Sequence, residues 1–161
     1  MIIKIVLLVI ILIIYLVYIL YLKPFFDVRR VIYTLRDFLS TRDSLILKLI
    51  PEVKNKELKE NVVGLINSRK EKFNLTYNDA IESDIRLNSE LKRLYEEINK
   101  IKNNRMVTGI FENIIKIEKE LKNIRTKYNE VATKYNDNLV KRKNVCIKLL
   151  KMRPLNTYKV K

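Results

Sequence analysis

The strongest constraint on this chain is an apolar run near its N-terminus. The stretch IVLLVIILIIYLVYILYL, residues 5–22, contains no charged residue and no glycine. At about 1.5 Å per residue, a helix of this length nearly covers the roughly 30 Å hydrocarbon core of a membrane. The run ends in Tyr-Leu-Lys-Pro, without the small-residue site at which a signal peptide is cleaved. We expect a retained transmembrane anchor over residues 1–23; the alternative is a buried core helix.

Flanking charges predict the orientation of this anchor. Only Lys4 precedes the run. The basic residues that follow it within about 20 positions, the range that matters for orientation, are Lys23, Arg29, Arg30, Arg36 and Arg42. Because Lys and Arg accumulate on the cytoplasmic side, we expect the N-terminus outside the cell and the rest of the chain in the cytoplasm.

Beyond residue 23, apolar residues recur every three or four positions, as in helices that bury one face. Pro51 interrupts this pattern once, and Asn103-Asn104 is typical of a loop. Thr76, Asn78 or Asp79 is expected to cap a helix. The blocks that follow the pattern are residues 24–49, 52–73, 79–102 and 107–141.

These blocks predict an all-α protein, with an N-terminal transmembrane helix followed by an antiparallel bundle of about four long helices. The predicted organisation is an anchor over 1–23, a helical bundle over 24–142 and a basic C-terminal tail over 143–161.

Composition excludes much familiar site chemistry. The chain has no histidine, a single cysteine, Cys146, and two widely separated glycines, Gly64 and Gly109. Histidine-based metal sites, Cys-His and Ser-His nucleophiles and glycine-rich phosphate loops therefore cannot be built. We predict no catalytic residues, no metal site and no cofactor.

A Tyr-Asn pair occurs twice in the last block, seven residues apart, as Tyr128-Asn129 and Tyr135-Asn136. Seven residues return a helix to nearly the same face. The tyrosines stand where isoleucine stands earlier in the block, so their rings should pack inward with the asparagines beside them. Two interpretations are open: the pairs fix the packing and register of the helix, or they line a ligand groove.

The stretch EKELKNIRTKYNEVATKYN, residues 118–136, resembles the signature of the LemA family. The turn LIPEVKN, residues 49–55, is similar to that family's helix junction. The family's third-loop proline is replaced here by Asn99, and its Phe-Pro by Arg142-Lys143. The residues to which the resemblance and the pattern assign structural or packing roles are Pro51, Glu118, Arg125, Tyr128, Asn129, Tyr135 and Asn136.

The resemblance implies a bacterial membrane protein with a short anchor, an external N-terminus and a cytoplasmic antiparallel bundle of long helices. It does not supply an activity.

The chain is basic, with a formal net charge of +15, and its last residues, 138–161, contain no acid. Such a segment can bind anionic lipid, and the alternative is a solvated tail. Cys146 is either a palmitoylation site or an idle thiol. The residues predicted to contact anionic lipid are Lys141, Arg142, Lys143, Lys148, Lys151 and Arg153.

Three function classes follow from these features. A membrane-anchored, non-catalytic interaction or scaffold module is favoured, with the bilayer, anionic lipid head groups and an unnamed protein as partners; homo-oligomerisation stays open. The alternative is a basic helical protein that binds nucleic acid or anionic lipid, although no specific nucleic acid is expected. An enzyme is disfavoured, because acidic pairs such as Glu82 with Asp84, or Glu96 with Glu97, do not share a helical face and are expected to be surface charges.

Overall fold

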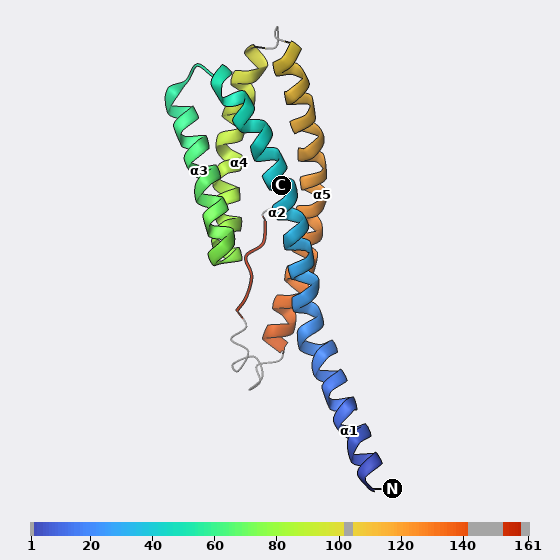
Figure 1. Cartoon of the computed structure of the whole chain (residues 1–161). Coiled ribbons are helices and arrows are strands. Elements are labelled where there is room, and N and C mark those ends of the chain that lie inside the picture. Colours follow the sequence, from blue (N-terminus) through green and yellow to red (C-terminus); the bar gives the residue numbers. More distant parts are fainter. Residues whose placement is uncertain (1, 102–104, 142–152, 159–161) are drawn as a thin grey trace.

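The computed structural model describes residues 2–101, 105–141 and 153–158, and all of its regular elements are helices (Figure 1). This confirms the all-α prediction of an N-terminal apolar helix followed by an antiparallel bundle of four long helices. The elements are α1 (Ile2–Val17), the π-helical turn η1 (Tyr18–Leu22), α2 (Lys23–Leu49), the 3₁₀ turn η2 (Ile50–Glu52), α3 (Lys56–Leu75), α4 (Tyr77–Lys100) and α5 (Arg105–Lys141).

Helix α1 projects beyond the end of the bundle and runs into α2 without a loop (Figure 1). The side chains from Ile3 to Ile19 are exposed, and the helix is long and apolar enough to cross a membrane. Pro24, which lacks an amide hydrogen, follows the junction. The π-helical turn accommodates it: the Lys23 N–H donates to Tyr18 O, one residue farther back than in an α-helix.

Side-chain caps decide where the next two helices begin. Asn55 Oδ1 accepts the Leu58 N–H at 3.0 Å, so α3 begins at Lys56. The sequence pattern had predicted a start directly after Pro51, at residue 52. Thr76 Oγ1 accepts the Asp79 N–H at 3.2 Å at the start of α4. Of the three candidate caps for this helix, Thr76 is therefore the one used.

The bundle consists of two antiparallel helix pairs, α2 with α5 and α3 with α4 (Figure 1). Its apolar interior is divided into two clusters along the bundle axis. The cluster nearer α1 includes Val28, Leu35, Leu39, Ile81, Leu121, Tyr128 and Tyr135, and the cluster farther from it includes Ile46, Leu49, Ile66, Leu87, Leu94 and Ile114.

Charged side chains lie between these two clusters. Arg42 falls between Leu39 and Ile46 along α2, and Asp84 between Ile81 and Leu87 along α4. All four bundle helices contribute to this set, which we call the charged layer. It comprises Arg42 and Asp43 of α2, Arg69 of α3, Asp84 of α4, and Glu118 and Arg125 of α5.

Helix α5 returns to the end of the bundle from which α1 projects. The ring of Tyr135 lies 6.5 Å from that of Phe25, near the start of α2. Residues 153–158 then run back along the bundle beside α4 and α5 (Figure 1). These six residues were predicted to be part of a separate tail, but their contacts place them with the bundle.

Candidate functional site

The repeated Tyr-Asn pair of α5 holds residues 153–158, which we call the C-terminal segment. Asn136 Oδ1 accepts the Leu155 N–H at 2.9 Å, and Asn136 Nδ2 donates to Leu155 O at 2.8 Å. Asn129 makes the same two bonds with the N–H and the carbonyl of Tyr158, both at 2.7 Å. Each asparagine therefore satisfies both main-chain groups of one residue, as a neighbouring strand does in a sheet.

The spacing of the repeat matches that of an extended chain. Seven residues of helix rise about 10.5 Å, and three residues of extended chain cover roughly 10 Å. Asn129 and Asn136 are seven residues apart on the helix α5, and their partners Tyr158 and Leu155 are three residues apart, so the two spacings match. The segment is therefore extended, and it runs antiparallel to α5.

Asn78 of α4 and Tyr128 of α5 hold the rest of the C-terminal segment. Asn78 Nδ2 donates to Pro154 O at 3.1 Å, and Asn78 Oδ1 accepts the Asn156 N–H at 2.8 Å. The Tyr128 hydroxyl donates to Asn156 O at 2.8 Å. All of these bonds are to main-chain atoms of the segment. We call the surface formed by Asn78, Tyr128, Asn129 and Asn136 the C-terminal groove.

Tyr158 anchors the C-terminal segment by its side chain. Its ring is buried and meets the ring of Tyr128 edge to face, with centroids 5.8 Å apart. The guanidinium carbon of Arg125 lies 5.4 Å from the Tyr158 ring centre, a cation–π distance. Burial, with a smaller contribution from the nearby Asp84 carboxylate, raises the pKa of Tyr158 and keeps the phenol neutral. Tyr158 therefore covers the charged layer on the side of the groove.

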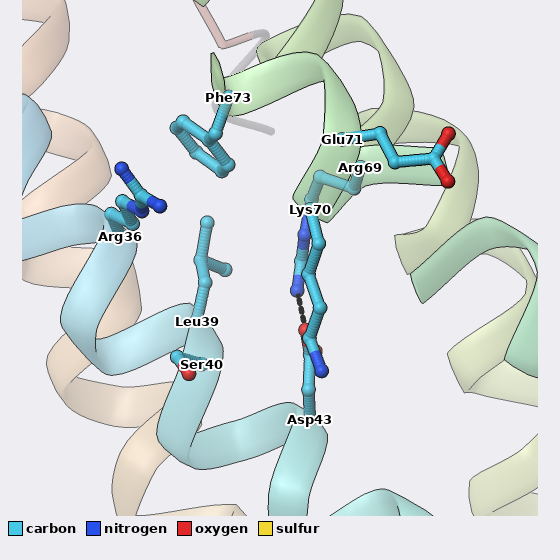
Figure 2. A pocket seen from close by; sticks show the side chains of 8 residues that line it. All are labelled: Arg36, Leu39, Ser40, Asp43, Arg69, Lys70, Glu71 and Phe73. Carbon is cyan, nitrogen blue, oxygen red and sulfur yellow. Dashed lines mark hydrogen bonds and ion pairs between the residues drawn. The ribbon is translucent and has the colours of Figure 1, made fainter. Parts of the chain in front are cut away.

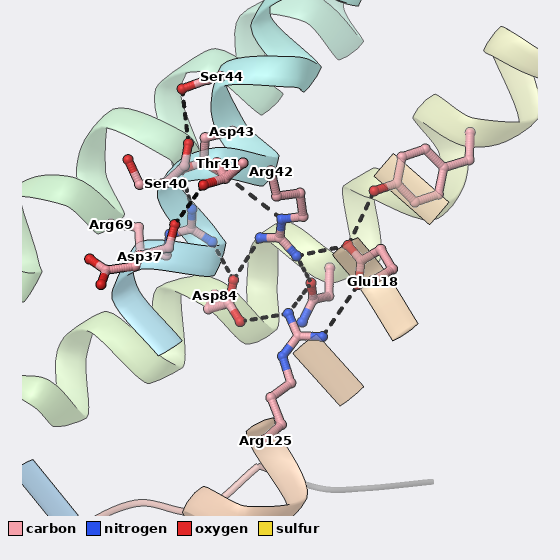
Figure 3. A network of polar contacts seen from close by, with 12 residues as sticks. Asp37, Ser40, Thr41, Arg42, Asp43, Ser44, Arg69, Asp84, Glu118 and Arg125 are labelled. Atoms are coloured by element: carbon pink, nitrogen blue, oxygen red, sulfur yellow. Dashed lines mark hydrogen bonds and ion pairs between the residues drawn. The ribbon is translucent and has the colours of Figure 1, made fainter. Parts of the chain in front are cut away.

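Asp84 is the centre of the charged layer (Figure 3). Its Oδ1 accepts from Arg42 Nη2 at 2.8 Å and from Arg69 Nη1, and its Oδ2 accepts from Arg125 Nη2 at 2.9 Å. Arg69 also donates to Asp43 Oδ2. One carboxylate of α4 thus receives guanidinium groups from all three other helices.

Arg42 and Glu118 extend this network towards α5. Arg42 Nη1 donates to Glu118 Oε1 at 2.9 Å and to Asn88 Oδ1 at 3.0 Å. Arg125 Nη1 lies 3.5 Å from Glu118 Oε2, and the Tyr95 hydroxyl donates to Glu118 Oε1 at 3.2 Å. The contacts within the layer therefore connect the α2–α5 pair to the α3–α4 pair.

For Asp84 and Arg42, the effect of ion pairing on the pKa outweighs the effect of burial. Burial alone would raise the pKa of Asp84, but Arg42, Arg69 and Arg125 together hold it well below its usual range. Burial likewise opposes the charge of Arg42, whose pKa is nevertheless raised by Asp84, Glu118 and Asp43. For Asp43 the balance differs: burial raises its pKa despite the opposing effect of Arg69.

The charged layer contains three arginines and three carboxylates, so its formal charges cancel. Arg42, Arg69 and Asp84 are buried, and a buried charge is tolerated only with partners in good geometry. Asp84 was expected to be a surface charge; that prediction was wrong, because Asp84 follows Ile81 by three positions and so lies on the buried, apolar face of α4. Glu82 and Glu96 are exposed, as expected.

A cavity of about 420 Å³ opens between α2 and α3, next to the charged layer (Figure 2). Asp43 and Arg69, which pair with each other, belong to its lining. The remaining lining combines cations, a carboxylate, a hydroxyl and two apolar side chains: Arg36, Lys70, Glu71, Ser40, Leu39 and Phe73. In the part of the chain that the structure describes, no group of three or more acidic or cysteine side chains could hold a metal ion.

The residues predicted from the family resemblance fall in four places. Glu118 and Arg125 belong to the charged layer, and Tyr128, Asn129 and Asn136 form the C-terminal groove. Tyr135 is buried in the cluster nearer α1, and Pro51 lies in the turn between α2 and α3.

The predicted lipid contacts are only partly described. Lys141 is exposed at the end of α5, and Arg153 is exposed at the start of the C-terminal segment. Arg142, Lys143, Lys148 and Lys151 lie outside the described residues, as does Cys146.

Comparisons with known proteins identify no relative of this chain. No family model matches the chain, and neither a curated protein nor a solved structure is significantly similar to it. The LemA resemblance therefore rests on the sequence signature alone.

The charged layer was not predicted as a unit from the sequence. The sequence does contain an indication of it, because on three helices a charged residue occupies a position that the apolar pattern assigns to the buried face. Arg42 occupies a position of the apolar pattern of α2, Arg69 follows Leu65 by four positions, and Asp84 follows Ile81 by three. A charge at a seam position of one helix predicts an opposite charge on a helix packed against it.

Proposed function

We propose that this protein is a non-catalytic interaction or scaffold module of the LemA type, anchored in a bacterial membrane by α1, with its bundle at the cytoplasmic face. This proposal rests mainly on the continuous helical segment from Ile2 to Leu49, in which η1 joins α1 to α2 without a loop. An exposed apolar helix continues directly into the bundle, so the bundle would stand at a fixed angle and height on the membrane.

The interior of the bundle supports a structural role for its ionisable groups. The arginines and carboxylates of the charged layer are engaged with one another, and its central carboxylate is held ionised by three guanidinium groups. A general acid or base instead needs a pKa close to the working pH. A partner protein would therefore bind to the outer surface of the bundle.

The proposed orientation relies on the basic residues after α1. Arg42 is buried and paired within the charged layer, so it contributes little to this flank. Lys23, Arg29 and Arg30 are exposed at the start of α2. Lys141 is exposed at the end of α5, on the same side of the bundle, where it would contact anionic lipid head groups.

Cysteine labelling tests this orientation. In a full-length chain carrying Cys146→Ser, a cysteine introduced by Glu112→Cys on the exposed face of α5 should resist a membrane-impermeant maleimide in intact cells and react after lysis. A cysteine placed ahead of Met1 should react in intact cells and serves as the matched control. Rapid labelling of residue 112 in intact cells would contradict the cytoplasmic orientation.

Crosslinking in membranes of the native host tests the scaffold role. Full-length protein should capture a reproducible set of partners, and replacing residues 2–22 by an unrelated transmembrane helix should leave that set unchanged. Disrupting the bundle through Asp84→Asn should remove it, because the partner surface depends on the packed helices. If the captured set follows the transmembrane helix and ignores the bundle, the bundle is not the interaction module.

A further inference from the structure

The C-terminal groove recognises an extended chain mainly through its backbone. Among the described residues, the hydrogen bonds from Asn78, Tyr128, Asn129 and Asn136 to the C-terminal segment all go to amide and carbonyl groups of residues 154–158. The side chains of Asn156 and Thr157 are exposed. Specificity therefore comes from two side chains three residues apart, the half-buried Leu155 and the buried Tyr158.

The polar groups of the C-terminal groove depend on a bound segment for their hydrogen-bond partners. Without the segment, Asn129 and Asn136 would lose paired partners, and the Tyr128 hydroxyl would lose its acceptor. Removal of Tyr158 would also expose the ring of Tyr128 and the Arg125 side of the charged layer to water. A groove filled by the identical segment of another copy keeps all of these contacts.

We propose that the C-terminal groove also accepts residues 153–158 of a second copy of this chain, so that neighbouring copies are joined by exchanged C-terminal segments. A second copy supplies the same Leu155, Tyr158 and main-chain groups, and therefore the same hydrogen bonds. Exchange of an identical element between copies has a low free-energy cost because the contacts are preserved.

The length of the chain permits this exchange. Residues 142–152 separate the end of α5 from the segment. Fully extended, they reach roughly 36–40 Å. Helices pack 8–10 Å apart, so two neighbouring four-helix bundles have axes on the order of 20 Å apart. Copies held by α1 in one membrane would also present their grooves at the same height and at high local concentration.

Crossed variants of the full-length chain test the exchange. The receiver carries Tyr158→Ala and a polyhistidine tag, so that its own segment binds poorly while its groove is intact. The donor carries Asn129→Asp and Asn136→Asp, which keep the side-chain shape but place carboxylate oxygens against the carbonyls of Leu155 and Tyr158. The receiver's groove can then be filled well only by the donor's segment.

Co-expressed receiver and donor should be recovered together on the affinity resin after extraction in mild detergent. Adding Asn129→Asp and Asn136→Asp to the receiver should lower donor recovery by at least about tenfold, because two paired amide contacts are lost. Adding Asn156→Ala and Thr157→Ala to the donor should leave recovery unchanged, because those side chains are exposed. Circular dichroism of each variant establishes that its helices are intact.

Donor recovery that is equal with the intact and the altered receiver groove would overturn the exchange and leave the segment as an intramolecular contact. A loss of recovery with the Asn156→Ala, Thr157→Ala donor would overturn main-chain recognition. These outcomes are independent of the scaffold proposal, because capture of other proteins by the bundle is measured separately.

Discussion

Replacing Asp84 by Asn is expected to lower the free energy of unfolding by about 3–5 kcal/mol, the usual cost of breaking a buried ion pair from one side. Asp84 accepts hydrogen bonds from Arg42, Arg69 and Arg125, so the neutral amide leaves three arginines facing two remaining carboxylates. It also weakens the connection between the two helix pairs. Denaturant unfolding of the full-length protein in detergent, followed by circular dichroism, measures the change.

Glu82→Gln on the same helix is the matched control. Glu82 pairs with Arg86 on the exposed surface, at 2.6 Å, and exposed pairs contribute about 0–1 kcal/mol. Its variant should therefore unfold close to the wild type. Equal, small effects of the two substitutions would show that the charged layer does not hold the helix pairs together.

Acid should act on the same carboxylate. Because the pKa of Asp84 is lowered in the folded state, its contribution to stability is fully present above the unfolded-state pKa of about 3.9 and is lost as the pH falls below it. Asp43 opposes this in part, because burial raises its pKa. Between about pH 5 and pH 2, the wild type should therefore lose more stability than Asp84→Asn.

Replacing Tyr128 by Ala should cost about 3–5 kcal/mol, the usual range for removing a large buried aromatic ring. The ring is fully buried and contacts Tyr158, so its loss affects both the bundle core and the C-terminal segment. Tyr128→Phe keeps the ring and removes only the bond to Asn156 O, at a cost of about 1 kcal/mol. Thermal melting of the full-length chain distinguishes the two variants.

The second effect of these Tyr128 variants should be local. Carboxypeptidase digestion should reach the C-terminal segment faster in Tyr128→Phe than in the wild type, because the segment has lost one of its bonds. Tyr33→Phe, at an exposed position of α2, is the control and should change neither measurement. If Tyr128→Ala melts like the wild type, the ring is not part of the core, and the ligand-groove interpretation of the repeat is favoured.

The helices of this protein can be located from local sequence patterns. Periodicity, Pro51 and the cap at Thr76 act between residues a few positions apart, so they can be recognised without knowing the fold. The apolar run of α1 is likewise a local property, and the structure leaves it exposed. The inward-facing rings of Tyr128 and Tyr135 followed from the same seam and are confirmed by their burial.

The contacts of the polar residues beside these rings, in contrast, depend on how the helices pack together. Asn129 bonds to Tyr158, 29 positions away, and Arg42 to Asp84, 42 positions away, across helices whose relative register no local pattern specifies. Asp84 was assigned to the surface because only its neighbours on the same helix were considered. A buried charge or amide is stabilised by groups that folding brings to it from other elements, so its role is fixed by the packing of the helices and not by their individual sequences.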